Sequence, residues 1–278
     1  LLIDGLALGA MPAKLLRSLD KTLIALHHHP LGLEPGLSHE TARARLSAEA
    51  EALAACAAIV TTSATTAETL TTQLGVPKAK ITIAEPGVSR RPPAPRRGDP
   101  PRILGVGTIS RRKGWDLLIP ALAPLAGLPW QLEIAGAQDR ESNETKALRA
   151  AIEAHDLSDR IALPGPLSEA ELAARYAAAD LFVLPSRYEG YGMVVAEAMA
   201  HALPVLTTTA GALPEVAGGA ARLVPPDDVP ALSAALAELL TSPAERDRLA
   251  EASRKRAETL PSWHDAAAKL ANLLRGLS

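Results

Sequence analysis

Residues 181–200 of this chain read LFVLPSRYEGYGMVVAEAMA, and this stretch decides the fold class. The apolar run 181–184 predicts a short buried strand, and the run 193–200 predicts a helix. The polar loop between them therefore follows the carboxyl end of a strand, the edge at which parallel α/β sheets bind ligands. Its two glycines, Gly190 and Gly192, let backbone N–H groups approach a ligand without a Cβ atom in the way.

Short apolar runs alternate with amphipathic stretches along almost the whole chain, which predicts an α/β protein with doubly wound parallel sheets. A linker at residues 89–101 holds five prolines and four arginines, which excludes a helix interior or a central strand. We expect about four strands before this linker and six after it. Residues 1–5 are expected to be the tail of a buried strand that runs into a turn, and the other expected strands are 23–26, 59–62, 81–83, 102–106, 131–135, 160–163, 181–184, 205–207 and 221–224. The expected helices are 40–57, 65–74, 115–125, 143–154, 169–178, 193–200, 229–240, 244–259 and 263–277.

Composition excludes several classes of protein. The 278 residues carry 29 basic and 31 acidic side chains, a balance that gives no reason to expect a nucleic-acid partner. The single cysteine, Cys56, excludes an intramolecular disulfide and fits a cytoplasmic location. No run approaches the ~18 apolar residues of a membrane-spanning helix. Because the chain opens on the apolar Leu1-Leu2-Ile3 without an initiator methionine, we expect residues to be missing upstream.

Two segments are candidates for phosphate binding, the first only a partial match to a known fingerprint. Gly105-Val106-Gly107-Thr108 ends a predicted strand, but Ser110 occupies the place of the third glycine of a dinucleotide fingerprint. The cations of Ser110-Arg111-Arg112-Lys113-Gly114 precede a helix start, where backbone N–H groups and the helix dipole already favour an anion. A solvated basic turn is the alternative.

Glu189 and Glu197 are the acidic candidates. Glu197 lies more than one turn into an otherwise apolar helix, where a carboxylate needs a polar partner. Ribose hydroxyls would suit Glu197, and a sugar hydroxyl would suit Glu189. The alternative for Glu197 is a solvent-facing position on the helix.

Three consecutive histidines, His27, His28 and His29, follow the predicted strand 23–26. At least one should lie at the ligand-binding edge, as a hydrogen-bonding or proton-handling group, and the alternative is a set of surface turn residues. No second cluster has metal-ligand spacing, so we expect no metal site there. There is also no Asp-x-Asp pair, Walker loop or Gly-x-Ser-x-Gly elbow.

Three motifs in order, residues 106–119, 185–200 and 211–216, resemble the donor domain of retaining family 4 glycosyltransferases. The resemblance covers residues 102–278, and the segment before the linker resembles the second half of that family's acceptor domain. It implies a GT-B fold with two Rossmann-like domains, the first truncated at its start. The implied parts are a partial acceptor-binding domain at 1–95, a nucleotide-sugar donor domain at 96–260 and a helix at 261–278 that crosses back to the first domain.

The resemblance also assigns roles to residues. It implies that Glu189 contacts the transferred sugar beside the reacting carbon and that His28, favoured over its neighbours, is the second catalytic residue. Glu197 would hold the ribose hydroxyls, and Lys113 the diphosphate. The other donor-binding positions are Gly107, Thr108, Arg112, Gly190, Tyr191, Gly192 and Met193. No metal ligand and no cofactor is implied.

Two departures from the family pattern stand out. Thr108 occupies a position where many members have an arginine that shares the diphosphate with the lysine, and we hypothesise that Arg112 compensates. The glycine-rich loop after the first strand of the acceptor domain is not found in this sequence.

The leading interpretation is a retaining, metal-independent hexosyltransferase that moves a sugar from a UDP- or GDP-sugar to a hydroxyl of a glycan, lipid or small-molecule acceptor. We expect a cytoplasmic location, or peripheral attachment to the inner face of the membrane. One alternative is a catalytically silent sugar-nucleotide-binding protein, which Thr108 and the missing loop favour. The other is a nicotinamide-dependent oxidoreductase, which Ser110 and the lack of an acidic residue in Ala135-Gly136-Ala137 disfavour.

Overall fold

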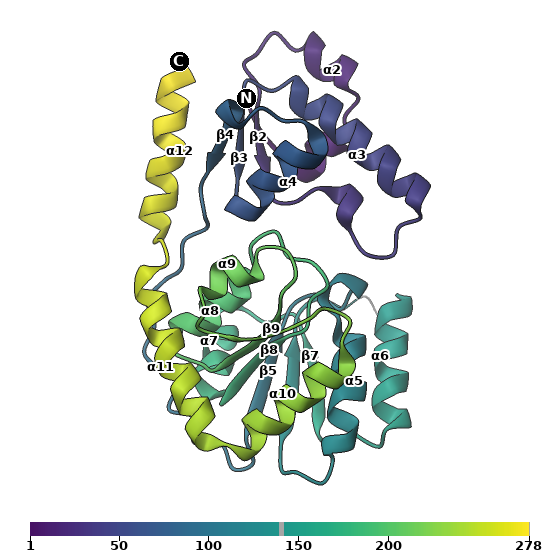
Figure 1. The fold of residues 1–278 in the computed structure, drawn as a ribbon, viewed down its shortest axis with the longest axis vertical. Helices are drawn as coiled ribbons and strands as arrows, with labels where there is room; N and C mark the ends of the chain where they lie inside the picture. Colours follow the sequence, from purple (N-terminus) through teal and green to yellow (C-terminus); the bar gives the residue numbers. More distant parts are fainter. Residues whose placement is uncertain (139–141, 278) are drawn as a thin grey trace. The chain divides into compact units, whose positions relative to one another are not determined.

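A computed structural model describes residues 1–138 and 142–277 and divides into two compact units. The N-terminal unit contains Leu1–Gly87, Glu189–Tyr191 and the segment that begins at Pro261. The C-terminal unit contains Val88–Tyr188 and Gly192–Leu260. Each unit is built on one parallel sheet with helices packed on it (Figure 1), which confirms the predicted fold class.

The N-terminal sheet has four strands in the order β1-β2-β3-β4, all parallel, as predicted. Cap residues fix two of its helix ends: Ser38 precedes one helix and accepts a hydrogen bond from the Thr41 N–H at 3.1 Å, and Gly75 ends another at φ +68°. The strands are β1 (Leu2–Asp4), β2 (Ile24–His27), β3 (Ala58–Thr61) and β4 (Ile81–Ile83). The helices are α1 (Gly5–Gly9), α2 (Ala13–Ser18), α3 (His39–Ala54), α4 (Ala64–Leu74) and α12 (Trp263–Leu277), with short 3-10 turns at Leu31–Leu33 and Lys78–Lys80.

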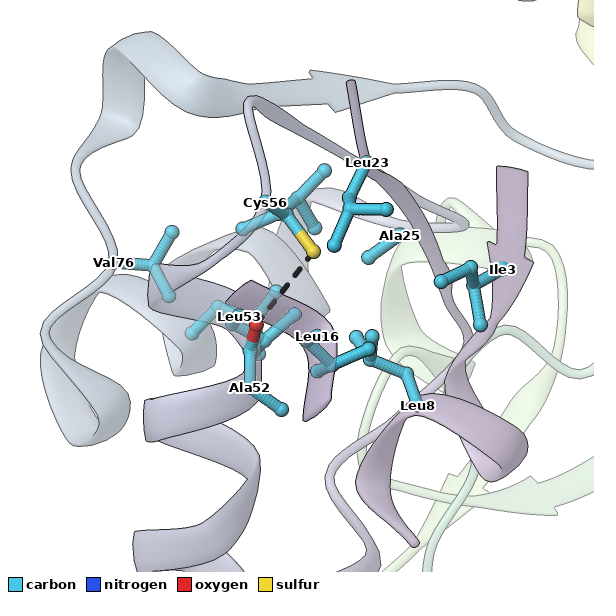
Figure 2. Packing of buried hydrophobic residues seen from close by; sticks show 11 residues of the cluster. Ile3, Leu8, Leu16, Leu23, Ala25, Ala52, Leu53, Cys56 and Val76 are labelled. Atoms are coloured by element: carbon cyan, nitrogen blue, oxygen red, sulfur yellow. Dashed lines mark hydrogen bonds between the residues drawn. The ribbon is translucent and has the colours of Figure 1, made fainter. Parts of the chain in front are cut away.

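Apolar side chains cover both faces of this sheet. On one face, strand residues pack against α1 to α4, and the lone Cys56 lies in that core with its Sγ donating to the Ala52 carbonyl (Figure 2). The cluster is Ile3, Leu8, Leu16, Leu23, Ala25, Ala52, Leu53, Cys56, Ile59, Leu70 and Val76. On the other face α12 packs on the strands, with Leu270, Leu273 and Leu277 against Ile24, Ala58 and Val60. This segment from the far end of the chain is therefore a layer of the N-terminal unit.

The C-terminal sheet has six parallel strands in the order β10-β9-β8-β5-β6-β7. The chain starts in the middle of the sheet at β5, proceeds outward to β7 and then crosses to β8, so the switch point lies between β5 and β8. The strands are β5 (Arg102–Val106), β6 (Gln131–Ala135), β7 (Ile161–Gly165), β8 (Leu181–Leu184), β9 (Val205–Thr208) and β10 (Arg222–Val224). The helices are α5 (Trp115–Leu122), α6 (Asn143–Ala154), α7 (Glu169–Ala178), α8 (Met193–Ala200), α9 (Leu213–Ala217), α10 (Val229–Thr241) and α11 (Pro243–Thr259), with 3-10 turns at Arg111–Lys113 and Ala123–Leu125.

Several predicted boundaries are wrong by a few residues. Strand β2 runs to His27, so the first histidine lies inside the sheet and not in the loop that follows. The helix predicted to reach residue 125 ends at Leu122 and continues as a 3-10 turn that contains Pro124, which has no N–H to donate to a further helical turn. The short helices α1, α2 and α9 were not among the expected elements.

Candidate functional site

The candidate site of the C-terminal unit lies at the carboxyl ends of β5 and β8. These strands are paired neighbours, with Ile103 opposite Leu181 and Leu104 opposite Phe182. Two loops leave this edge: the β5 loop, residues 107–114, and the β8 loop, residues 185–192. Because the strands are parallel, both loops emerge at the same edge of the sheet.

The two loops are hydrogen-bonded to each other. The Arg187 N–H donates to the Arg112 carbonyl at 2.8 Å, and Nη1 of Arg112 donates to the Tyr188 carbonyl at 3.1 Å. A Cβ on Gly114 would lie 2.1 Å from the Pro185 carbonyl oxygen, and Gly114 has φ +70°. The backbones are therefore packed too closely for any larger residue at this position.

Lys113 lies over the end of β5. Its side chain is buried, with 8% of the residue exposed, and a Cβ on Gly107 would stand 3.0 Å from its Cε. Gly107, at φ +153°, makes room for the lysine stem in a backbone conformation that L side chains rarely adopt. Thr108 beside it is exposed, and its carbonyl accepts a hydrogen bond from Trp115 Nε1 at 3.1 Å.

Helix α8 begins at the end of the β8 loop. Gly192 is the N-cap residue of α8, and its backbone lies in the left-handed region at φ +99°. Because glycine has no side chain, it provides no side-chain acceptor for the first N–H groups of the helix. The first N–H groups of a helix have no acceptor within the helix, and the dipole adds partial positive charge there, so this terminus favours an anion. Met193, the first residue of α8, is 36% exposed.

Glu197 lies one turn further along α8 and is half-buried. Tyr176 on α7 donates a hydrogen bond from Oη to Glu197 Oε2 at 2.9 Å and stacks on His201 at a ring-centroid distance of 5.2 Å. Burial raises the pKa of Glu197, and the hydrogen bond from Tyr176 opposes part of that effect. The alternative of a solvent-facing Glu197 is therefore wrong.

The tip of the β8 loop, Glu189–Tyr191, belongs to the N-terminal unit. Glu189 is buried, with 6% exposed, and the Gly190 carbonyl accepts hydrogen bonds from Ser63 Oγ at 2.7 Å and Thr66 Oγ1 at 3.2 Å. A Cβ on Gly190 would lie 2.1 Å from the His28 carbonyl oxygen, so only glycine fits beside the histidine segment.

The three histidines have different surroundings. His27 is buried in β2, with Nε2 3.5 Å from Glu49 Oε1. His28 is partly exposed, and its Nε2 lies 3.1 Å from Asp4 Oδ2 at the end of β1. His29 has its Nε2 3.2 Å from Glu34 Oε1.

Sequence reasoning missed Glu49, which is 2% exposed and accepts hydrogen bonds from the Leu31 N–H at 3.0 Å and the Gly32 N–H at 3.4 Å. It fixes the segment that follows the histidines. Sequence reasoning also missed Tyr176 and the ion pairs of Arg187 with Asp116 and Asp227. The signal available for Glu49 was a carboxylate inside an alanine-rich helix. Tyr176 and Arg187 gave no such signal, because each lies far along the sequence from the residues it binds.

Within residues 1–138 and 142–277 there is no group of three or more His, Cys, Asp or Glu side chains placed to hold a metal ion. None of the helices that the structure describes is both long and apolar enough to cross a membrane.

Residues 89–256 match the family model described as Glycosyl transferases group 1, and residues 4–91 match the model described as Glycosyltransferase Family 4. Among curated relatives, the MMP alpha-(1->4)-mannosyltransferase of Mycolicibacterium hassiacum is 35% identical over 217 residues, covering 76% of this chain and 52% of the relative. The D-inositol 3-phosphate glycosyltransferase of Kineococcus radiotolerans is 31% identical over 213 residues, covering 66% of this chain and 49% of the relative. The chain thus spans about half the length of these relatives.

Solved structures share the fold. Sucrose-phosphate synthase from Thermosynechococcus elongatus superposes with a TM-score of 0.86 at 26% identity, covering 99% of this chain and 73% of that one. The Anabaena HepE structure in complex with UDP-glucose gives a TM-score of 0.83 at 19% identity, covering 99% and 78%, which is a likeness of fold. Two parallel-sheet Rossmann-like units are the components of the GT-B fold, as predicted. The chain belongs to the glycosyl transferases group 1 family.

Proposed function

We propose that the protein containing this chain transfers a sugar from a UDP- or GDP-sugar to a hydroxyl group in glycan or glycolipid synthesis, with retention of configuration and without a metal ion. The observation that carries the proposal is the buried Lys113 over Gly107, on a loop tied to the β8 loop that leads into α8. The HepE structures were solved with UDP, with UDP and glucose, and with UDP-glucose, which supports a nucleotide-sugar ligand.

The chemistry follows from the charges that develop as the anomeric bond breaks. Negative charge grows on the departing diphosphate, and we assign its stabilisation to the Lys113 ammonium and the N-terminal N–H groups of α8, with Arg112 beside them. Gly107 and Gly192 carry no Cβ where the Lys113 stem and Leu213 pack, so the lysine and the start of α8 can take these positions. This arrangement supplies without a metal the positive field that a divalent ion provides elsewhere.

The remaining roles in the proposal follow the family resemblance. Glu197 accepts hydrogen bonds from the ribose hydroxyls, and the backbone at Gly190 and Tyr191 lines the phosphates. Glu189 stabilises the positive charge on the sugar, and His28 binds near its primary hydroxyl. The acceptor is a glycan, a lipid or a small molecule, and we place the protein in the cytoplasm or peripherally on the inner face of the membrane.

Calorimetric titration of the chain with UDP, GDP and ADP tests the donor site. We expect one of these nucleotides to bind, and Lys113→Ala to weaken that binding by about tenfold or more, because a charge-assisted contact is lost. Lys255→Ala is the matched control, since Lys255 is an exposed lysine of the same unit, 3.5 Å from Glu251. An equal affinity for wild type and Lys113→Ala would refute the assignment.

Catalysis is tested on the full-length protein. We expect release of nucleoside diphosphate from the cognate donor, an α-linked product from an α-donor by NMR, activity that survives EDTA, and a rate for Glu189→Ala lower by at least about a hundredfold. Equal rates for wild type and Glu189→Ala would refute the catalytic role. Nucleotide binding without turnover by the wild-type protein would favour the catalytically silent alternative.

A further inference from the structure

The Arg187 guanidinium links its own loop to three other segments of the C-terminal unit. Its Nη1 and Nη2 each donate to one carboxylate oxygen of Asp116 at 2.7 Å, a bidentate pair. Nη1 also donates to the Arg111 carbonyl at 2.7 Å, and Nε donates to Asp227 Oδ1 at 2.6 Å. These contacts link the β8 loop to the β5 loop, to the first turn of α5 and to the segment after β10.

The surroundings of this side chain exclude a direct role in holding a phosphate. All three guanidinium nitrogens already donate to protein oxygens, and the side chain is only 10% exposed. Two carboxylates, Asp116 and Asp227, face its single positive charge, so the cluster is net negative. The hydrogen bonds to Asp116 are the main reason that the pKa of Arg187 is raised, which keeps this side chain charged.

Arg187 contacts residues on both sides of Lys113 in the sequence. On one side of the lysine, the Arg187 side chain binds the Arg111 carbonyl and its backbone N–H binds the Arg112 carbonyl. On the other side, the guanidinium binds Asp116 in the first turn of α5. The short 3-10 turn that carries Lys113 is therefore anchored before and after the lysine by one residue of the neighbouring loop.

We propose that Arg187 is a positioning residue that fixes Lys113 against the diphosphate of the donor. The inference rests on the proposed function, since it takes Lys113 to be the diphosphate ligand. Asp227 holds the far side of the guanidinium from a backbone in the left-handed region, at φ +60°, and the next residue, Asp228, caps α10 by accepting the Ala231 N–H at 2.8 Å. On one side Arg187 is thus held by Asp227, next to the capped start of α10. On the other side its contacts position the 3-10 turn that carries Lys113.

The test is the ratio of the Kd for a nucleoside monophosphate to the Kd for the matching diphosphate, measured by calorimetry on the whole chain with the base that the wild type prefers. Only the diphosphate offers the second phosphate to Lys113, so this ratio reports the position of the lysine. We expect Arg187→Met, which keeps an unbranched apolar stem, to lower the ratio about tenfold with little change in the monophosphate Kd. Arg222→Met, which breaks the exposed 3.1 Å pair with Glu238, is the control and should leave the ratio unchanged.

A second measurement separates positioning from general stability. In a Lys113→Ala background, Arg187→Met should not lower the ratio further, because the residue on which it acts is gone. If Arg187→Met does not fold, Arg187→Lys keeps the charge but loses the bidentate geometry, and it should lower the ratio at least about threefold. A wild-type ratio in the folded Arg187 variants, or a loss of monophosphate and diphosphate affinity in equal proportion, overturns the inference. A wild-type chain that binds diphosphate no better than monophosphate overturns the proposed function instead.

Discussion

The phenol of Tyr176 on α7 donates a hydrogen bond across 2.9 Å to Oε2 of Glu197 on α8. Tyr176 is 2% exposed, and burial raises its pKa well above the ordinary value, so the phenol keeps its proton and remains a donor. Its ring also stacks on His201 with an interplanar angle of 13°. Two helices therefore cooperate to orient the carboxylate that we assign to the ribose.

Removing this phenol should affect ribose recognition. Tyr176→Phe keeps the ring stack and loses the hydrogen bond, which is worth about 1 kcal/mol or slightly more when the acceptor is charged. We expect the affinity for the nucleoside diphosphate to fall about fivefold and the affinity for its 2′-deoxy analogue to fall less. Calorimetry with both ligands measures the preference. A preference for the ribonucleotide equal to that of wild type would show that Tyr176 does not act through Glu197.

The buried Glu197 should make stability depend on pH. Because burial raises its pKa above 4.5, the folded state holds the proton more tightly than the unfolded state does. Below pH 4.5 this carboxyl is protonated in both states and does not lower the free energy of unfolding. As pH rises through its raised pKa, it lowers the free energy of unfolding by a growing amount. We expect the Tm of Glu197→Gln, relative to wild type, to increase from pH 4 to pH 7. A Tm difference that is constant with pH in thermal unfolding would contradict this assignment.

Gly192 should not tolerate a side chain. Its φ of +99° disfavours an L residue, and a Cβ would lie 2.7 Å from Leu213 Cδ2. We expect Gly192→Ala to lower the free energy of unfolding by about 2 to 4 kcal/mol, combining backbone strain with overpacking. Gly219→Ala is the control: its φ is +81°, yet nothing lies within 4 Å, so it should cost only about 1 kcal/mol. Denaturant unfolding gives both values, and equal losses would rule out the predicted clash.

Glu49 should hold the segment after the histidines in place. Glu49→Ala leaves the Leu31 and Gly32 N–H groups without their carboxylate acceptor and should cost about 3 kcal/mol of stability. We expect faster hydrogen exchange at these two amides by NMR. Glu51→Ala, at an exposed position of the same helix, is the control and should change neither quantity. Unchanged exchange at both amides in Glu49→Ala would refute this role.

The regular elements were predictable because apolar runs and helical spacing are local properties of the sequence. The strand 181–184 and the helix starting at Met193 were found in this way, and β8 and α8 confirm both. The surroundings of His27 were not predictable, because one additional strand residue moves a side chain between the loop and the buried face of the sheet.

The contacts around the candidate site were harder to predict than the elements. Arg187 meets Asp116 and Asp227, residues that are 71 and 40 positions away in the sequence, and no local pattern pairs them. Glu197 was singled out by its apolar helix, but its partner Tyr176 lies on another helix. Motif spacing thus points to candidate ligand-binding residues more readily than to the residues that hold those candidates in place.

The covering of the first sheet by α12 has a consequence for the order of folding. A Cβ on Gly87 would lie 2.0 Å from the Trp263 N, so the point where the chain first leaves the N-terminal unit lies beside the start of the last segment that returns to it. The C-terminal unit is in this sense an insertion between β4 and α12. On the ribosome, the face formed by Ile24, Ala58 and Val60 emerges before the insertion, and α12 can cover it only after the whole insertion is made. The unit that is synthesised first therefore completes its core only after the second has been translated.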